Sequence, residues 1–239
     1  MTTFVLVHGT GAGGWCWKPV ARLLRADGAE VYAPTLSGLG DRAHLLACGI
    51  DLMTHIADVS NLLFFEDLTD VVLVGHSYAG MVITGVAATV PERLGQLIYL
   101  DAYLPDKGQS EYDLWPPELR ADVDLAAGVR PPPPPSLMGI TDPQLAEWTM
   151  ARVTPHPVAT YLQAPPPAGP ASAAIPRAFI SCTASDTSWV FGRFAEKARS
   201  LGWPVRELAT GHDAMLIDPA GVAALLTELA AARRNGPGS

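Results

Sequence analysis

The sequence predicts an α/β fold with a mostly parallel, doubly wound sheet and a proline-rich insertion. Short apolar runs alternate along the chain with longer stretches that carry a helical pattern. The run at 71–74 is continuously apolar, which is typical of a strand buried on both faces. Parallel strands need long crossover connections, and the intervening helices supply them. Only residues 103–176 interrupt this alternation, and they hold 16 of the 22 prolines.

The strands are predicted from their apolar, β-branched residues and the helices from their periodicity. We expect strands at 4–7, 31–33, 71–74, 97–100, 178–180 and 205–208. We expect helices at 17–26, 54–65, 78–89, 191–201 and 219–232. Asp27 and Gly28 form a turn before the second strand. Pro219 suits the first turn of the last helix, because the N–H that proline lacks would be unpaired there anyway.

The proline-rich segment is interpreted as a cap over one end of the sheet. Five consecutive prolines at 131–135 fit neither a helix interior nor a central strand. The stretch after residue 176 is too short to form a doubly wound domain of its own. We therefore expect residues 1–102 and 177–239 to form one core, with 103–176 inserted as the cap. The alternative is a disordered linker between two domains.

Large apolar side chains in this segment argue against a solvated linker. Trp115, Met138 and Trp148 are expected to lie above the carboxyl ends of the strands and to line an apolar substrate pocket. The alternative is that they pack on the helices of the core and never contact substrate.

Composition limits the partners of the protein. The 239 residues are 49% hydrophobic, which is enough for one sizeable core. The net charge of −8 and the absence of a basic cluster argue against nucleic acid as a partner. No apolar run reaches the ~20 residues of a membrane span, and no basic region precedes the first apolar run as in a signal peptide. A small-molecule substrate is expected, and the sequence leaves open whether the protein forms a homodimer.

The cysteines and histidines give no sign of a metal or a disulfide framework. The three cysteines, Cys16, Cys48 and Cys182, are few and scattered, as is typical of small buried side chains. The histidines show no metal-ligand spacing, and no phosphate-binding loop is present. The sequence therefore predicts no cofactor, no metal and a reduced, cytoplasmic compartment.

The strongest motif joins the run at 71–74 to a predicted helix through Gly75, His76 and Ser77. A buried strand, a sharp turn with a serine and a helix form the nucleophile elbow. The turn needs small residues on either side of the serine, and Gly75 and Ala79 satisfy this need. Ser77 is therefore the expected nucleophile. The alternative is an ordinary helix N-cap.

A glycine-rich loop follows the first strand. Gly9, Gly11 and Gly14 match the dinucleotide-binding pattern, but the second strand ends at Tyr32-Ala33-Pro34 without the acidic residue that would bind a ribose. Glycines also let a backbone N–H approach a developing oxyanion. We favour this second use of the loop.

A histidine after the predicted strand at 205–208 can reach a serine at the same sheet edge. His212 is therefore the expected general base, and an acid should lie between Ser77 and His212 in the sequence. Asp186, after the strand at 178–180, is the expected acid. Asp101, at the end of another strand, is the rival.

These motifs, in this order, resemble the α/β-hydrolase fold, and the chain is similar to its branch of plant methylesterases, hydroxynitrile lyases and bacterial relatives. The likeness covers residues 3–110 and 176–230, and the cap matches only in position. It is carried by His8-Gly9-Thr10, Trp15-Cys16-Trp17, Leu39-Gly40-Asp41-Arg42, Gly75-His76-Ser77, Leu100-Asp101-Ala102-Tyr103-Leu104-Pro105, Cys182-Thr183 and His212-Asp213-Ala214-Met215-Leu216.

The resemblance implies that Thr10 and Tyr78 donate the two N–H groups of an oxyanion hole. In that family the acid usually stands two residues after Cys-Thr, whereas Asp186 stands further along. The lyases carry a lysine directly after the catalytic histidine and a threonine after the opening histidine. This chain has Asp213 and Gly9 at these positions, so lyase activity is not expected.

The sequence thus predicts a serine hydrolase that cleaves a small hydrophobic or aromatic carboxylic ester, or a thioester, through an acyl-enzyme. Two alternatives stay open. The same site can serve lactone formation, cyclisation or C–C cleavage in a biosynthetic pathway, or the chain can be a ligand receptor of low turnover.

Overall fold

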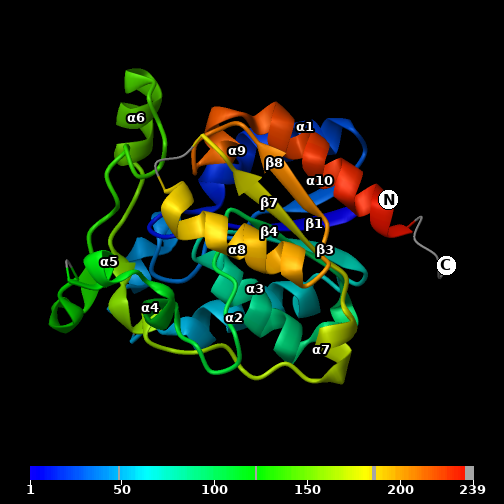
Figure 1. The fold of residues 1–239 in the computed structure, drawn as a ribbon, viewed down its shortest axis with the longest axis horizontal. Helices are drawn as coiled ribbons and strands as arrows, with labels where there is room; N and C mark the ends of the chain where they lie inside the picture. Colours follow the sequence, from blue (N-terminus) through cyan, green and yellow to red (C-terminus); the bar gives the residue numbers. More distant parts are fainter. Residues whose placement is uncertain (48, 122, 185–186, 235–239) are drawn as a thin grey trace.

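A computed structural model describes residues 1–47, 49–121, 123–184 and 187–234 (Figure 1). Its main sheet has six strands in the order β2-β1-β3-β4-β7-β8, and every neighbouring pair is parallel. This confirms the predicted fold class, and each predicted strand is present with bounds that differ by a few residues. The strands are β1 (Thr3–Val7), β2 (Glu30–Tyr32), β3 (Val71–His76), β4 (Leu94–Leu100), β7 (Arg177–Cys182) and β8 (Val205–Leu208).

Helices cover both faces of the sheet (Figure 1). One face carries α1 (Lys18–Ala26), α9 (Ala214–Ile217) and α10 (Pro219–Arg234), and the other carries α2 (Leu52–Phe65), α3 (Ala79–Thr89) and α8 (Ser188–Ser200). None of the helices in the described ranges is long and apolar enough to cross a membrane.

The central strand β3 serves two separate hydrophobic cores. Val71 and Leu73 pack with the helices α2, α3 and α8, whereas Val72 and Val74 pack with α1 and α10. Successive side chains of a strand point to opposite faces, so a strand between two cores must be apolar throughout. Each fully buried side chain of this kind stabilises the fold by ~1.5–3 kcal/mol.

The segment at 103–176 lies mainly at the sheet edge toward which the arrow of β7 points (Figure 1). There α4, α5 and α6 extend away from the core, and β5 pairs antiparallel with β6. The segment contains α4 (Glu111–Leu114), α5 (Pro117–Ala121), η4 (Leu125–Ala127), β5 (Val129–Arg130), α6 (Pro143–Met150), β6 (His156–Pro157), η5 (Val158–Tyr161) and α7 (Pro170–Ala174). We call the segment at 103–176 the cap. The core adds the 3₁₀ helices η1 (Gly14–Trp17), η2 (Gly40–Leu45) and η3 (Pro91–Arg93).

The chain reverses its winding direction between β1 and β3. From β1 it continues to the edge strand β2, and from β3 it proceeds the other way to β4. At such a switch point the loops that follow the two strands diverge and leave a crevice at their carboxyl ends. The glycine-rich loop follows β1 and Ser77 follows β3, so both predicted motifs lie at this crevice.

Close backbone packing fixes the turn after β3. A Cβ atom on Gly80, in the first turn of α3, would lie 2.0 Å from the carbonyl oxygen of Tyr103. A Cβ atom on Gly75 would lie 2.7 Å from the carbonyl oxygen of Ala79. Backbone atoms cannot move aside as a flexible side chain can, so these positions must remain glycine.

We predict that Gly80→Ala lowers the free energy of unfolding by ~1–3 kcal/mol, because the new methyl group overpacks the contact with Tyr103. Gly192, in α8, has no atom within 4 Å of a built Cβ and is the matched helical control. Gly192→Ala should leave stability unchanged or raise it by ~0.5–1 kcal/mol. Urea unfolding of both variants measures the difference, and equal effects would contradict the packing argument.

Candidate active site

Ser77 occupies a sharp turn between β3 and α3. Its φ angle is +54°, in the left-handed region that costs a non-glycine residue ~1–3 kcal/mol. Three backbone hydrogen bonds hold the turn: the Ser77 N–H donates to Leu100, and the Ser77 carbonyl accepts from Gly80 and Tyr103. The backbone geometry is therefore that of the predicted nucleophile elbow.

His212, in the loop between β8 and α9, is paired with a buried carboxylate. Its Nδ1 lies 2.7 Å from Oδ2 of Asp101, which is 1% exposed. The other oxygen, Oδ1, accepts the N–H of Cys182 at 3.2 Å. Asp101 directly follows β4 and also has a left-handed backbone, with a φ angle of +42°. The two bonds fix the carboxylate against the imidazole, which can therefore carry a proton on Nδ1.

The carboxylate that pairs with His212 is not the one expected from the sequence. Asp186, the acid expected from the sequence, lies outside the residues that the structure describes. The carboxylate found at Nδ1 of His212 is that of Asp101, the rival. The sheet order explains the contact: β4 pairs with β7, so the end of β4 lies beside the end of β7, and β8 brings the His212 loop next to them.

Ser77 and His212 line one cavity, which has about 890 Å³ of empty volume and is partly open to solvent. The glycine-rich loop, the cap and the start of α8 supply its walls. The phenyl ring of Phe191 stacks on the His212 imidazole with 4.4 Å between ring centroids. Apolar side chains contribute most of the wall, among them Leu119, Leu137, Met138, Val153, Trp189 and Met215.

The three apolar cap residues expected at the substrate have different places. Met138 lines the cavity. Trp115 is 1% exposed and belongs to the hydrophobic core, where its ring lies 4.9 Å from that of Tyr161. Trp148 is 38% exposed, packs edge-on against Trp15 and borders a separate hollow beside α6. Neither tryptophan is among the described residues that line the cavity, so the expectation of substrate contact is replaced by packing roles.

The glycine-rich loop is held from the cap. The Gly11 N–H donates to Nδ1 of His156 at 3.1 Å, and the Gly11 carbonyl accepts the Thr154 N–H at 2.8 Å. Beside this anchor, the backbone N–H groups of Thr10 and Tyr78 have no hydrogen-bond acceptor within the described part of the chain. Two unpaired N–H groups beside the serine can donate hydrogen bonds to a ligand oxygen.

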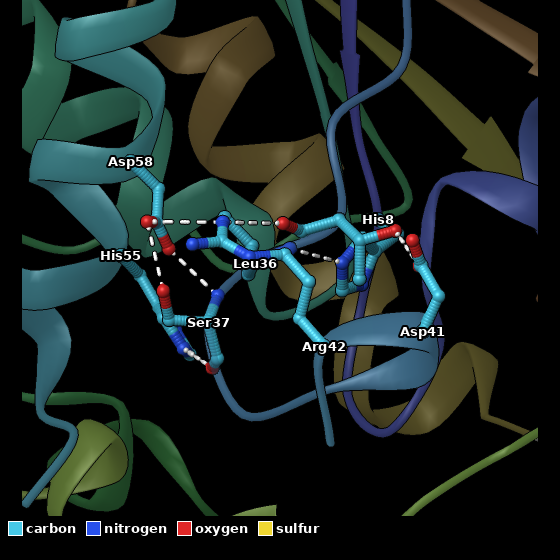
Figure 2. A network of polar contacts seen from close by, with 8 residues as sticks. His8, Leu36, Ser37, Asp41, Arg42, His55 and Asp58 are labelled. Carbon is cyan, nitrogen blue, oxygen red and sulfur yellow. Dashed lines mark hydrogen bonds and ion pairs between the residues drawn. The ribbon is translucent and has the colours of Figure 1, made fainter. Parts of the chain in front are cut away.

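A polar network fixes the loop between β2 and α2 (Figure 2). Oδ2 of Asp58 accepts the Ser37 N–H at 2.7 Å, and Oδ1 accepts the Ser37 hydroxyl at 2.9 Å and the Arg42 guanidinium at 3.2 Å. Nε2 of His55 lies 2.9 Å from the Ser37 carbonyl, and its Nδ1 lies 2.7 Å from the Tyr78 hydroxyl. The network therefore connects this loop to the residue that follows Ser77.

His8 joins the same loop to β1 as a neutral ring. Its Nδ1 donates to the Gly9 carbonyl at 2.9 Å, and its Nε2 accepts the Leu36 N–H at 3.0 Å (Figure 2). Burial lowers the pKa of His8 to about 4, which agrees with an uncharged ring that both donates and accepts. His8 thus has a structural role.

Two further acids line the cavity. Burial raises the pKa of Asp213 to about 6 and that of Glu111 to about 8. The side chains of His76, His212 and Asp213 lie close enough together to hold a cation. However, Nε2 of His76 donates to the His212 carbonyl at 3.0 Å, and Nδ1 of His212 is paired with Asp101.

Sequence reasoning missed His55, His156, Glu111 and Arg130. None of them belongs to a local motif in the sequence, and the partners of His55 and His156 include residues distant in the sequence. No local pattern could have shown that Glu111 and Arg130 line the cavity or that His55 and His156 hold the loops around it.

Comparison with known proteins agrees with this architecture. The protein-family model described as "Alpha/beta hydrolase family" matches residues 4–225 of the sequence. A carbendazim hydrolyzing esterase from Nocardioides sp. (strain SG-4G) is 39% identical over 243 residues, which cover 96% of this chain and 100% of the relative. Methylesterase 1 from Arabidopsis thaliana is 36% identical over 118 residues, which cover 45% of this chain and 41% of the relative.

Solved structures show the same fold. An extracellular alpha/beta-hydrolase from a Paenibacillus species superposes with a TM-score of 0.83 at 24% identity, over 95% of this chain and 98% of its own. The methylesterase MES16 from Arabidopsis superposes with a TM-score of 0.76 at 23% identity, over 97% and 99% of the two chains. The chain therefore belongs to the alpha/beta hydrolase family, within its branch of carboxylic ester hydrolases.

Proposed function

We propose that the chain hydrolyses a small hydrophobic or aromatic carboxylic ester, or a thioester, through an acyl-enzyme on Ser77. His212 acts as general base and Asp101 as its acidic partner. One observation carries the proposal: a serine in a strained turn lines the same cavity as a histidine whose Nδ1 is paired with a buried carboxylate. This constellation activates a serine for acyl transfer.

The pair at Nδ1 sets the direction of proton transfer. With the Nδ1 proton donated to Asp101, the lone pair of His212 is on Nε2. The Ser77 Oγ adds to the ester carbonyl carbon, and Nε2 takes the hydroxyl proton. When the C–O bond to the leaving group breaks, Nε2 returns that proton to the alkoxide and the alcohol departs. Water then repeats the cycle on the acyl-enzyme and releases the acid.

The negative charge of each tetrahedral intermediate needs donors that are already in place. The N–H groups of Thr10 and Tyr78 are assigned this role, because the described residues provide no acceptor for either. His156 and Thr154 hold the loop of Thr10, and the Tyr78 side chain is tied to His55. Donors held in this way cost little reorganisation when the charge develops.

The apolar walls of the cavity support the proposed substrate class. Leu137, Met138 and Trp189 favour a hydrophobic or aromatic group over a short acetate. The end-to-end relative named as a carbendazim hydrolyzing esterase makes carbendazim a test substrate beside aryl and methyl esters. A cytoplasmic location is part of the same proposal.

We predict that Ser77→Ala folds like the wild type and loses ~10⁴-fold or more in kcat on aryl esters. The substitution removes only the nucleophilic oxygen from the turn. A fluorophosphonate probe followed by peptide mass spectrometry should locate the label on Ser77. Labelling at another residue, or unchanged turnover in the variant, would contradict the assignment.

The second prediction separates the two aspartates. Asp101→Asn should lower kcat by ~10⁴, because an amide that donates to Nδ1 stabilises the wrong histidine tautomer. Its oxygen can still accept the Cys182 N–H, so the fold should be retained. Asp186→Asn is the matched control and should cost far less. Steady-state kinetics decide between them, and the opposite ranking would return the acid to Asp186.

A further inference from the structure

A carboxyl group of the cap lies buried beside the proposed substrate cavity. Glu111, the first residue of α4, is 1% exposed and lines the cavity together with Ser77 and His212. Its Oε1 accepts the indole N–H of Trp115 at 3.0 Å. Its Oε2 is shielded from solvent and has no hydrogen-bond partner among the described residues. A buried polar atom left unpaired costs ~1–3 kcal/mol, so a ligand that pairs it gains affinity.

The surroundings of Glu111 keep it in the neutral form. Burial raises the pKa of Glu111 to about 8, and Arg130 opposes this shift only in part. Other titratable or charged groups in this region include the hydroxyls of Tyr78, Tyr103 and Tyr161, whose pKa values are themselves raised by burial, and the guanidinium of Arg193, which donates to the Leu114 carbonyl at the end of α4. At pH 7 Glu111 is therefore a carboxylic acid. Since Oε1 accepts from Trp115, the acid proton is on Oε2, which is then a donor.

Arg130 supplies a second set of donors at the same place. It belongs to β5, lines the cavity and has its guanidinium 4.9 Å from the ring centre of Trp115, the residue that bonds Glu111. A guanidinium offers only donors. These two residues, from separate cap elements, line a cavity whose other walls are mainly apolar. The group that satisfies both is an oxygen acceptor.

We propose that Glu111 and Arg130 form a hydrogen-bonding subsite for a second carbonyl oxygen, so that the preferred substrates are esters carrying another carbonyl group away from the scissile bond. This inference rests on the proposed esterase function for its substrate class. It adds a polar recognition element to a cavity that would otherwise select by size and hydrophobicity.

The test compares p-nitrophenyl octanoate with its 4-, 5-, 6- and 7-oxo analogues, because the series moves the second carbonyl along the chain. For each ester, kcat/KM is measured at pH 6.5 in the wild type, Glu111→Gln and Glu111→Leu. We expect Glu111→Leu to lower the ratio of the best oxo ester to octanoate about tenfold. Glu111→Gln should keep the ratio, because its amide oxygen can accept from Trp115 while its NH₂ group donates. Glu118→Leu, an exposed residue of α5, is the matched control and should not change the ratio.

The pH dependence gives an independent readout that does not need Glu111→Leu to fold. In the wild type the ratio should fall as pH rises through about 8, because Oε2 loses the proton that it donates. In Glu111→Gln the ratio should stay level from pH 6.5 to 9.5. A wild-type ratio that is independent of pH, or a ratio within twofold of wild type in Glu111→Leu, would overturn the subsite. A comparable loss in Glu118→Leu would overturn it as well.

Binding separates failure of the subsite from failure of the esterase proposal. The affinities of Ser77→Ala for the oxo esters and for octanoate are measured by calorimetry, alone and combined with Glu111→Leu. We expect Ser77→Ala to bind the best oxo ester about tenfold more tightly than octanoate, and the double variant to bind the two equally. This result supports the subsite even if the wild type hydrolyses none of these esters. If the ratio of the two affinities, oxo ester to octanoate, is the same in Ser77→Ala and in the double variant, the subsite is refuted, whatever the turnover of the wild type.

Discussion

The geometry of the candidate site depends on close packing of the backbone at the carboxyl end of β3. Ser77 keeps its left-handed backbone because the elements around it approach more closely than side chains allow. A Cβ atom on Gly9 would lie 2.9 Å from that of Ser77, and one on Gly80 would lie 2.0 Å from the Tyr103 carbonyl. Tight packing therefore holds the serine at the crevice between the loops after β1 and β3. A strained residue persists only where the surrounding structure over-determines it.

The electrostatics of the site build on this frame. Asp101 is buried, and both of its oxygens are occupied, one by His212 and one by the Cys182 N–H. Buried carboxylate oxygens that lack such partners cost free energy. Here the bonds hold it as an acceptor for the imidazole. The parallel register that places the ends of β4 and β7 side by side is therefore also the condition for the pair of Asp101 with His212.

The fold could be predicted because its signals are local, and so could the common location of Ser77 and His212, which line one cavity. The apolar run at 71–74 marks a doubly buried strand, and small residues around Ser77 mark a sharp turn. The acid carries no such local signal. Asp101 and Asp186 both follow predicted strands, and the choice depends on which strand end approaches His212 in three dimensions. The prolines of the cap suppress periodicity, so the sequence could not show that Trp115 is core, that Trp148 lies at the surface, or that Glu111 borders the cavity.

The cap has two roles, lining the cavity and anchoring the glycine-rich loop, and only the first was expected from the sequence. It supplies walls of the cavity, including Met138, Glu111 and Arg130. It also anchors the glycine-rich loop through Thr154 and His156, whose contacts with Gly11 set the position of the loop that carries Thr10. The residues that would choose a substrate and those that would hold the oxyanion donors are thus parts of one packed segment. A change that reshapes the cap for a new substrate must preserve the bonds to Gly11, or it will disturb the chemistry that it was meant to redirect.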